Sequence, residues 1–201
     1  MNGHAWLGRI NTVLFDLDGT LTLPVLDFPA MRRALAIPDG ESITHALQRR
    51  PEAEREAGLA YIRQCELEAA RNTRASPGAV EFVNWLHGRG TPTGIITRNF
   101  REAVDVTLDL LGLRFEVIIT RDCAPPKPAP DPIHEALRRL RREAATTLMV
   151  GDYHDDMQAG KAAGTFTCLV NHEAGPPRYE ADMHVRHLGE LQQRMHEADA
   201  R

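Results

Sequence analysis

Short apolar runs alternate with helix-like patterns along most of this chain. Runs of mostly apolar residues predict strands at 12–15, 93–96, 116–119, 147–150 and 166–170, with a shorter one at 183–185. Helical spacing of apolar residues follows Ser76-Pro77 and Asp131-Pro132, and a last helix is expected at about 188–195. Strands that alternate with helices are typical of βαβ units, so we expect an α/β fold with a Rossmann-like, doubly wound parallel sheet.

The segment between Thr22 and Ser76 breaks this rhythm because it contains no convincing strand. Three helix-like pieces occupy it, beginning near Asp27, Ser42 and Pro51. An all-helical insertion directly after the first strand favours a cap over a functional site, and a subdomain with only a packing role is the alternative. We therefore predict a core domain of residues 1–21 and 77–201 and a helical cap domain of residues 22–76.

Polar residues follow the first four predicted strands. They are Asp16, Thr97, Thr120 and, after one glycine, Asp152. In an open parallel sheet, ligands bind outside the carboxyl ends of the strands, where the strand order changes direction. These positions are therefore the first candidates for a functional site.

The pair Asp16 and Asp18 carries the strongest chemical signal. Two carboxylates leave a buried strand and enter a glycine turn, and buried carboxylates need hydrogen bonds or cations. An Asx-turn at a strand end would explain one aspartate better than two. One interpretation is that Asp16 attacks phosphorus to form an aspartyl phosphate while Asp18 handles the proton of the leaving group.

Two further positions suit phosphate binding. Thr97 stands at a strand end before a predicted helix N-terminus, which offers side-chain and backbone donors to an anion. Lys127 is the single lysine of a proline-rich turn at 125–131, where a fixed ammonium group would neutralise phosphate. Taken alone, a capping threonine and a solvated loop lysine are the plainer interpretations.

Three carboxylates, Asp152, Asp155 and Asp156, open the helix that follows the fourth strand. One aspartate is enough for helix capping and for a favourable interaction with the helix dipole. The additional carboxylates fit a hard cation such as Mg²⁺, which takes one or two carboxylates together with waters and phosphate oxygens.

In this order, the four elements resemble the motifs of the haloacid dehalogenase superfamily, over residues 13–170. The matching residues are Asp16-Leu17-Asp18-Gly19-Thr20, Thr97, Lys127-Pro128-Ala129-Pro130, and Gly151-Asp152 with Asp156. The insertion after the first strand resembles the helical-cap branch of phosphoglycolate phosphatases and β-phosphoglucomutase-like proteins.

The resemblance implies a role for each residue of the metal and catalytic groups. Asp16 would be the nucleophile and a ligand of Mg²⁺. Asp18 would be the general acid and base, with its backbone carbonyl on the metal as well. Asp152 would be the remaining protein ligand.

The resemblance also implies which groups hold the phosphate. Thr97 and Lys127 would bind the transferring phosphoryl group, and Asp156 would orient the site from behind the metal ligands or through water. Asp155 is the adjacent alternative to Asp156, with helix capping as its expected role, and His154 is expected at the rim. Further substrate contacts are assigned to Gly19, Thr20, Arg98 and Asn99.

The implied activity is that of a phosphoric monoester hydrolase, a Mg²⁺-dependent phosphatase acting on a small phosphate monoester. Asp18 argues against cleavage of carbon–halogen bonds and of phosphonates, whose enzymes lack an acid at this position. A phosphomutase acting on a sugar phosphate is the alternative, although such mutases usually carry a cap-entry histidine and none occurs from 21 to 44. A catalytically silent binding protein of the same fold and, more remotely, a response-regulator receiver are the alternatives from other classes.

Composition narrows the expected partners and location. The 201 residues carry a formal net charge of −4, which offers no general attraction to nucleic acid or acidic lipid. Three scattered cysteines, the lack of a signal-like N-terminus and the lack of any run of roughly 20 apolar residues favour a cytoplasmic protein. We expect a small phosphorylated metabolite as partner, no nucleic acid and no membrane, and leave monomer or dimer open.

Residues 171–180 are expected to form a loop.

Overall fold

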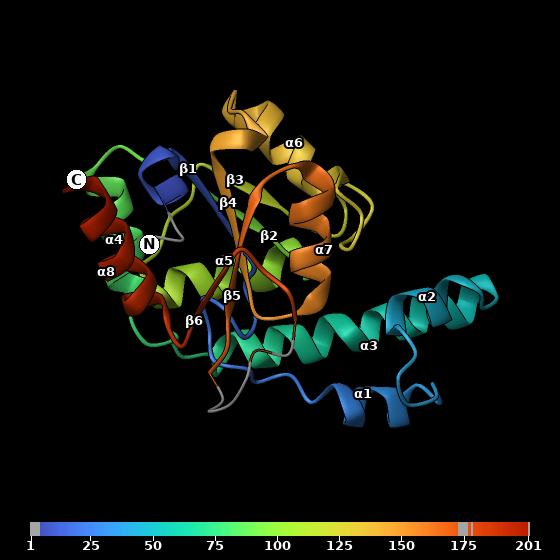
Figure 1. The fold of residues 1–201 in the computed structure, drawn as a ribbon. Helices are drawn as coiled ribbons and strands as arrows, with labels where there is room; N and C mark the ends of the chain where they lie inside the picture. Colours follow the sequence, from blue (N-terminus) through green and yellow to red (C-terminus); the bar gives the residue numbers. More distant parts are fainter. Residues whose placement is uncertain (1–4, 173–176, 178, 201) are drawn as a thin grey trace.

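The computed structural model describes residues 5–172, 177 and 179–200, and its centre is a parallel sheet (Figure 1). Six strands pair in the order β3-β2-β1-β4-β5-β6, and every pairing is parallel. The strands are β1 (Thr12–Phe15), β2 (Thr93–Ile96), β3 (Val117–Ile119), β4 (Thr147–Gly151), β5 (Phe166–Val170) and β6 (Met183–Val185). The expected Rossmann-like parallel sheet is confirmed.

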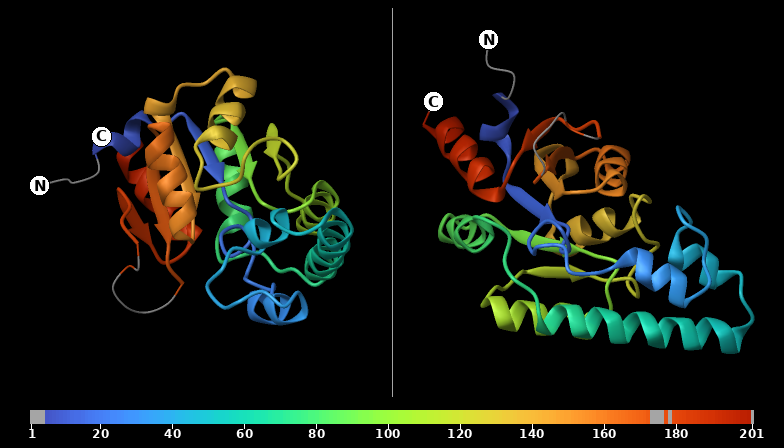
Figure 2. Two further views of the ribbon diagram at one scale, coloured as in Figure 1. Left: turned by 90° about the vertical axis from the view of Figure 1, so that its right-hand side faces the viewer. Right: turned by 90° about the horizontal axis from the view of Figure 1, so that it is seen from below.

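Helices cover both faces of the sheet (Figure 2). Successive side chains of a strand point to opposite faces, so Val13 and Phe15 pack on one side and Leu14 on the other. The first face carries the 3₁₀-helix η1 (Ala5–Arg9), α4 (Ala79–Gly88), α5 (Arg101–Leu111) and α8 (Leu188–Asp199). The second face carries α6 (Asp131–Leu140) and α7 (His154–Ala163), and a short 3₁₀-turn, η2 (Ala144–Thr146), leads into β4.

The strand order changes direction between β1 and β4. From β1 the chain builds outward through β2 and β3 on one side, and β4, β5 and β6 extend the sheet on the other. Phe15 is aligned with Val150, and the Asp16 amide donates to the Val150 carbonyl at 2.8 Å. The residues that follow β1 and β4 therefore emerge side by side, at the position where open parallel sheets bind ligands.

The insertion after β1 is helical and has a small apolar core of its own. It contains α1 (Phe28–Ala34), α2 (Ile43–Gln48) and α3 (Glu52–Arg71). The side chains of Asp27 and Ser42 accept hydrogen bonds at the starts of α1 and α2, as capping residues do. Its buried apolar residues are Met31, Leu35, Ile37, Ala46, Leu47 and Ile62. The three helical pieces match the expectation, while the exact division into domains at 21/22 and 76/77 stays a prediction.

The long helix α3 connects this insertion to the core because it lies beside α5 (Figure 2). On the exposed side of this contact, Arg63 Nε donates to Glu102 Oε2 at 2.7 Å. The insertion is thus held against the face of α5 as well as by its two chain connections.

Some predicted boundaries differ from the structure. The fourth helix begins at Ala79 rather than at Ser76-Pro77, and Gly78 precedes it with a φ of +79°. The left-handed backbone places Gly78 outside the helix, and a Cβ there would lie 2.3 Å from the backbone N of Gly189, so this close approach to the start of α8 requires glycine.

Two further expectations concern single elements. The last helix continues to Asp199 instead of ending near Met195. The expected loop at 171–180 lies partly outside the described residues, which lack 173–176 and 178. Within the described part of the chain, no helix is both long and apolar enough to cross a membrane.

Candidate active site

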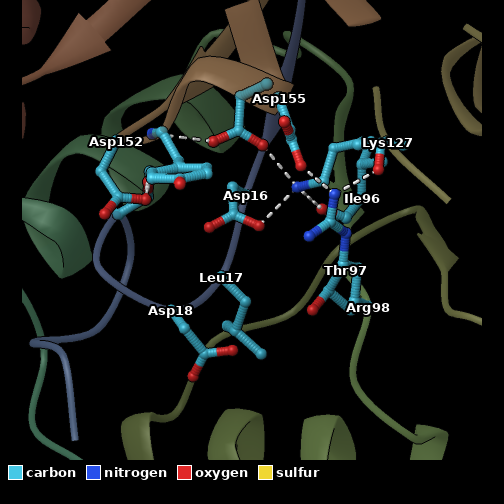
Figure 3. Close-up of polar contacts among 12 residues, drawn as sticks. Asp16, Leu17, Asp18, Ile96, Thr97, Arg98, Lys127, Asp152 and Asp155 are labelled. Carbon is cyan, nitrogen blue, oxygen red and sulfur yellow. Dashed lines mark hydrogen bonds and ion pairs between the residues drawn. The ribbon is translucent and has the colours of Figure 1, made fainter. Parts of the chain in front are cut away.

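The predicted site residues converge at the carboxyl ends of the central strands (Figure 3). Asp16 and Asp18 follow β1, and Thr97 follows β2. Lys127 comes from the segment between β3 and α6, and Asp152 follows β4. Figure 3 shows these side chains around one common space, although they come from four separate parts of the chain.

Lys127 is the central cation of this cluster. Its Nζ lies 2.5 Å from Asp16 Oδ1 and 2.6 Å from Asp156 Oδ1, and it donates to the carbonyl oxygen of Ile96 at 2.8 Å. Lys127 is only 5% exposed. Burial opposes its charged form, but the adjacent Asp156 and Asp16 carboxylates raise the pKa of the ammonium above its ordinary value. The interpretation of Lys127 as a solvated loop residue is therefore wrong.

The carboxylates around Lys127 form a compact group that suits a divalent cation. Oxygen atoms of Asp16, Asp152 and Asp156 lie within 4.8 Å of one another. Burial, opposed by Lys127 and assisted by neighbouring carboxylates, raises the pKa of Asp16 well above its ordinary value. Burial and then the charge of Asp156 raise the pKa of Asp152 to about 7. One lysine does not balance this many buried carboxylates, and hard oxygen donors are the ligands that Mg²⁺ prefers.

Within this group, Asp156 is occupied by protein partners. Its Oδ1 contacts Lys127, and its Oδ2 accepts the Tyr153 amide at 3.1 Å. Asp16 and Asp152 are left as the two carboxylates best able to hold a cation, which fits the assignment that the motif resemblance implies.

Glycines in the motifs allow the carboxylates to approach the backbone closely. Gly19 has a φ of +82°, and a Cβ there would lie 2.3 Å from Asp152 Oδ2. A Cβ at Gly151 would lie 2.4 Å from Asp156 Oδ2. Side chains at these two positions would displace the acidic groups, so the site requires glycine at both.

Asp18 lies in a setting that suits a proton carrier. The side-chain Nδ2 of Asn99 donates to Asp18 Oδ2 at 2.7 Å. The backbone N–H of Asn99 donates to Thr97 Oγ1 at 3.1 Å. Burial raises the pKa of Asp18, while the Asn99 hydrogen bond and the charge of Lys127 oppose this rise. A buried carboxyl group with a raised pKa is suited to donate and then to accept a proton.

The contacts of Arg98 and Thr20 connect them to neighbouring protein groups. Arg98 Nη2 donates to the Lys127 carbonyl oxygen and pairs with Asp155. Thr20 Oγ1 donates to Asp152 Oδ1 at 3.4 Å. Roles for Arg98, Thr20 and the other assigned residues in binding substrate stay predictions.

Asp155 was expected to cap the helix, but the contacts of Asp155 and Asp156 differ from that expectation. Asp155 contacts Arg98 and lies 2.7 Å from His154 Nδ1, whereas Asp156 accepts the amide at the helix start. The capping assignment was therefore wrong. It failed because adjacent residues on a helix point in different directions, and only Asp156 is turned back toward Tyr153.

Sequence reasoning missed two residues near the site. His172 Nε2 donates to the Gly19 carbonyl oxygen at 2.8 Å, from a loop that is 153 positions away in sequence. Glu66 on α3 is 4% exposed and accepts the Phe100 amide at 2.8 Å. No sequence pattern indicated that His172 would lie near the site. Glu66 falls on the same helical spacing as the buried Ile62 and Ala70, and a charged residue at such a position was a usable signal.

Together the fold and the site define a class of protein, an α/β protein with a helical insertion after β1 and an aspartate nucleophile candidate at the end of that strand. A family model for haloacid dehalogenase-like hydrolases matches residues 10–164. The chain belongs to this family, and the resemblance drawn from the motifs is confirmed.

Individual relatives agree with this assignment. An uncharacterised hydrolase of Saccharomyces cerevisiae is 34% identical over 203 residues, which cover 95% of this chain and 93% of the relative. The pyrophosphatase PpaX of Anoxybacillus flavithermus is 33% identical over 191 residues, covering 81% of this chain and 84% of the relative. A solved hydrolase structure from Pseudomonas syringae superposes with a TM-score of 0.80 at 23% identity, covering 93% and 98% of the two chains. The chain is therefore similar in sequence to the two relatives over 81–95% of its length, and similar in fold to the solved structure over 93% of it.

Proposed function

We propose that this protein is a Mg²⁺-dependent phosphatase that hydrolyses a small phosphate monoester through an aspartyl phosphate on Asp16. The observation that carries the proposal is the contact between Asp16 and Lys127 at 2.5 Å, at the end of β1 and beside the protonatable Asp18. A nucleophile, a fixed cation and a proton carrier are the groups that two-step phosphate hydrolysis needs.

In the first step, a carboxylate oxygen of Asp16 attacks phosphorus, and the bond from phosphorus to the ester oxygen breaks. Asp18 gives its proton to the leaving oxygen. Lys127 neutralises negative charge on the transferring group, and the Thr97 hydroxyl binds one of its oxygens. Phosphoryl transfer depends mainly on such positioning and charge neutralisation.

In the second step, Asp18 takes a proton from water, and the water oxygen attacks phosphorus. The bond between phosphorus and the Asp16 oxygen breaks, which releases inorganic phosphate and restores the carboxylate. A Mg²⁺ ion held by Asp16, Asp152 and the Asp18 carbonyl would supply further charge neutralisation at the phosphoryl oxygens. The predicted cap, α1 to α3, would limit the access of water during the first step.

We prefer hydrolysis to phosphomutase activity because mutases of this kind usually carry a histidine in the segment that enters the cap. The first histidine of the insertion in this chain lies elsewhere. His45 belongs to α2, which lies at the end of the insertion remote from the sheet (Figure 1). It is therefore poorly placed to assist transfer at Asp16. A mutase would reveal itself by converting one sugar phosphate into its isomer without releasing phosphate.

Pyrophosphate is the second substrate candidate. The relative named pyrophosphatase PpaX is 33% identical over most of both chains. Arg98, which contacts the Lys127 carbonyl oxygen, adds a second cationic side chain beside the site. Pyrophosphate therefore belongs among the compounds to be tested.

The deciding experiment measures phosphate release from phosphorylated metabolites, pyrophosphate and p-nitrophenyl phosphate, with and without Mg²⁺. We expect turnover that requires the metal and that is lost in Asp16→Asn. The change is isosteric, so circular dichroism should show an unaltered fold. Absence of turnover by the wild-type protein on every compound would overturn the proposal and favour a binding role. Most of the activity surviving in Asp16→Asn would overturn the nucleophile.

A further inference from the structure

Glu66 is a buried carboxylate that the proposed reaction does not use. It lies on α3, within the predicted cap, and is 4% exposed. Its Oε2 accepts the backbone N–H of Phe100 at 2.8 Å, and its Oε1 pairs with the guanidinium of Arg121. Both partners belong to the core, 34 and 55 positions away in sequence. Glu66 therefore joins the two predicted domains at a point hidden from solvent.

The peptide that Glu66 holds belongs to the segment that carries phosphate-site residues. Phe100 is the N-cap residue of α5 and directly follows Asn99. Asn99 Nδ2 donates to Asp18 Oδ2 at 2.7 Å. A continuous set of contacts thus runs from Glu66 on the cap helix, through Phe100 and Asn99, to the group proposed as acid and base.

Arg121 strengthens the same connection. Its guanidinium carbon lies 4.0 Å from the centroid of the Phe100 ring, while the guanidinium pairs with Glu66. Phe100 is therefore held through its amide and its ring by two residues that also hold each other. A buried ion pair by itself is weak evidence for stability, so the geometry that it imposes on Phe100 is the more informative feature.

We propose that Glu66 is a positioning residue that aligns Asp18 for proton transfer through its contacts with Phe100 and, one residue earlier, Asn99. This inference rests on the proposed phosphatase function. Small displacements of a general acid reduce proton transfer strongly, because the donor must lie within hydrogen-bond reach of the leaving oxygen. Loss of Glu66 should therefore impair the reactions that depend most on the acid.

Leaving-group dependence provides the test. An alkyl leaving group needs a proton from Asp18, whereas p-nitrophenolate leaves readily without one. The ratio kcat/KM reports events up to formation of the aspartyl phosphate, so it isolates the acid step from later hydrolysis. For Glu66→Ala we expect kcat/KM to fall by about tenfold or more with an alkyl phosphate and by less than about threefold with p-nitrophenyl phosphate.

Two comparisons separate positioning from general damage. Asn99→Ala should give the same leaving-group pattern, and the Glu66→Ala/Asn99→Ala protein should be no worse than the poorer single variant, since both changes interrupt one connection. Glu66→Gln keeps an oxygen that can accept the Phe100 amide and should retain most of the alkyl phosphate activity.

A matched control lies on the same pair of helices. Arg63 and Glu102 also connect α3 to α5, but their side chains are 49% and 54% exposed. Glu102→Gln should leave both kcat/KM values within about twofold of wild type, because an exposed pair contributes little. If Glu66→Ala does not fold, Glu66→Leu/Arg121→Leu replaces it, since exchanging a whole buried ion pair for apolar residues is often nearly neutral for stability.

The outcomes distinguish this inference from the proposed function. Turnover by wild type that is lost in Asp16→Asn supports the phosphatase, whatever Glu66 does. Equal losses of kcat/KM for both leaving groups in Glu66→Ala, no loss for either, or additive effects with Asn99→Ala would overturn the positioning role. Lack of any turnover by wild type would overturn the phosphatase and, with it, this inference.

Discussion

Lys127 and Asp156 form a buried ion pair in which Nζ lies 2.6 Å from Oδ1, with side-chain exposures of 4% and 3%. Because Lys127 also contacts Asp16, its ammonium links the start of α7 to the end of β1. The same charge that would neutralise a phosphoryl group thus holds together two carboxylates that would otherwise repel each other. Catalysis and stability should therefore both depend on this lysine.

Replacing Lys127 with methionine should abolish turnover and destabilise the metal-free protein by about 3–5 kcal/mol, since a buried carboxylate loses its partner. Urea denaturation in EDTA measures the free energy of unfolding. Lys161→Met is the matched control, because Lys161 is 46% exposed and 3.5 Å from Glu180. It should change stability by less than about 1 kcal/mol. An unchanged midpoint for Lys127→Met would contradict the role of the pair.

Binding of Mg²⁺ should stabilise the protein, and the effect should require Asp152. At a free concentration about 100 times the dissociation constant, binding contributes about 2.7 kcal/mol. For a chain of this size that corresponds to a rise in Tm of roughly 5–10 °C, which thermal unfolding with MgCl₂ or EDTA measures. Asp152→Asn should lose most of this rise, whereas Asp155→Asn should keep it because Asp155 pairs with Arg98 outside the cluster. A full Mg²⁺ response in Asp152→Asn would remove Asp152 from the metal site.

Glu66 should make stability depend on pH. Burial, opposed by Arg121 and by the Phe100 amide, raises the pKa of Glu66 from 4.5 to about 7. Between these values the folded state binds more protons than the unfolded state, so the free energy of unfolding falls as pH rises from about 4.5 to about 7. The contribution of Glu66 to this fall is roughly 2–3 kcal/mol.

Urea denaturation of wild type and Glu66→Gln from pH 4.5 to 8 measures this contribution, since glutamine does not titrate. The difference in unfolding free energy, wild type minus variant, should decrease by the stated amount as pH rises. Glu102→Gln, from the exposed pair on the same helices, serves as control and should show no such trend. Parallel pH profiles for wild type and Glu66→Gln would contradict the raised pKa.

Substituting alanine for Gly19 should disable the site through contact as well as backbone strain. The added Cβ would lie 2.3 Å from Asp152 Oδ2, so we expect at least a tenfold loss of kcat/KM and weaker binding of Mg²⁺. Gly40 provides the matched control, since its φ of +81° equals that of Gly19 within a degree but its Cβ would meet nothing within 4 Å. Gly40→Ala should cost about 1–2 kcal/mol of stability and leave kcat/KM unchanged. Equal activity in both variants would show that the contact with Asp152 is unimportant.

Local sequence patterns were sufficient to predict the main helices and strands and to select the principal residues of the candidate site. Runs of apolar residues predicted the sheet strands because a buried parallel strand is apolar on both faces, as Val13, Leu14 and Phe15 show. Polar residues after those runs identified Asp16 and Asp152, since such groups are costly to place at a buried strand end without a function. The order of the motifs then identified the family, which the family comparison confirmed.

Relationships between distant residues were decided only by the tertiary structure. The motif assigned Lys127 to the site, but only the folded chain shows that its Nζ lies within reach of both Asp16 and Asp156. Whether Asp155 or Asp156 caps α7 depends on side-chain directions that a linear spacing does not contain. Glu66 acquires its partners because α3 lies beside α5, a packing contact between helices separated by a strand and another helix. The sequence by itself determined which groups this protein carries, and long-range packing decided which of them meet, because distances, burial and pKa values belong to the folded arrangement.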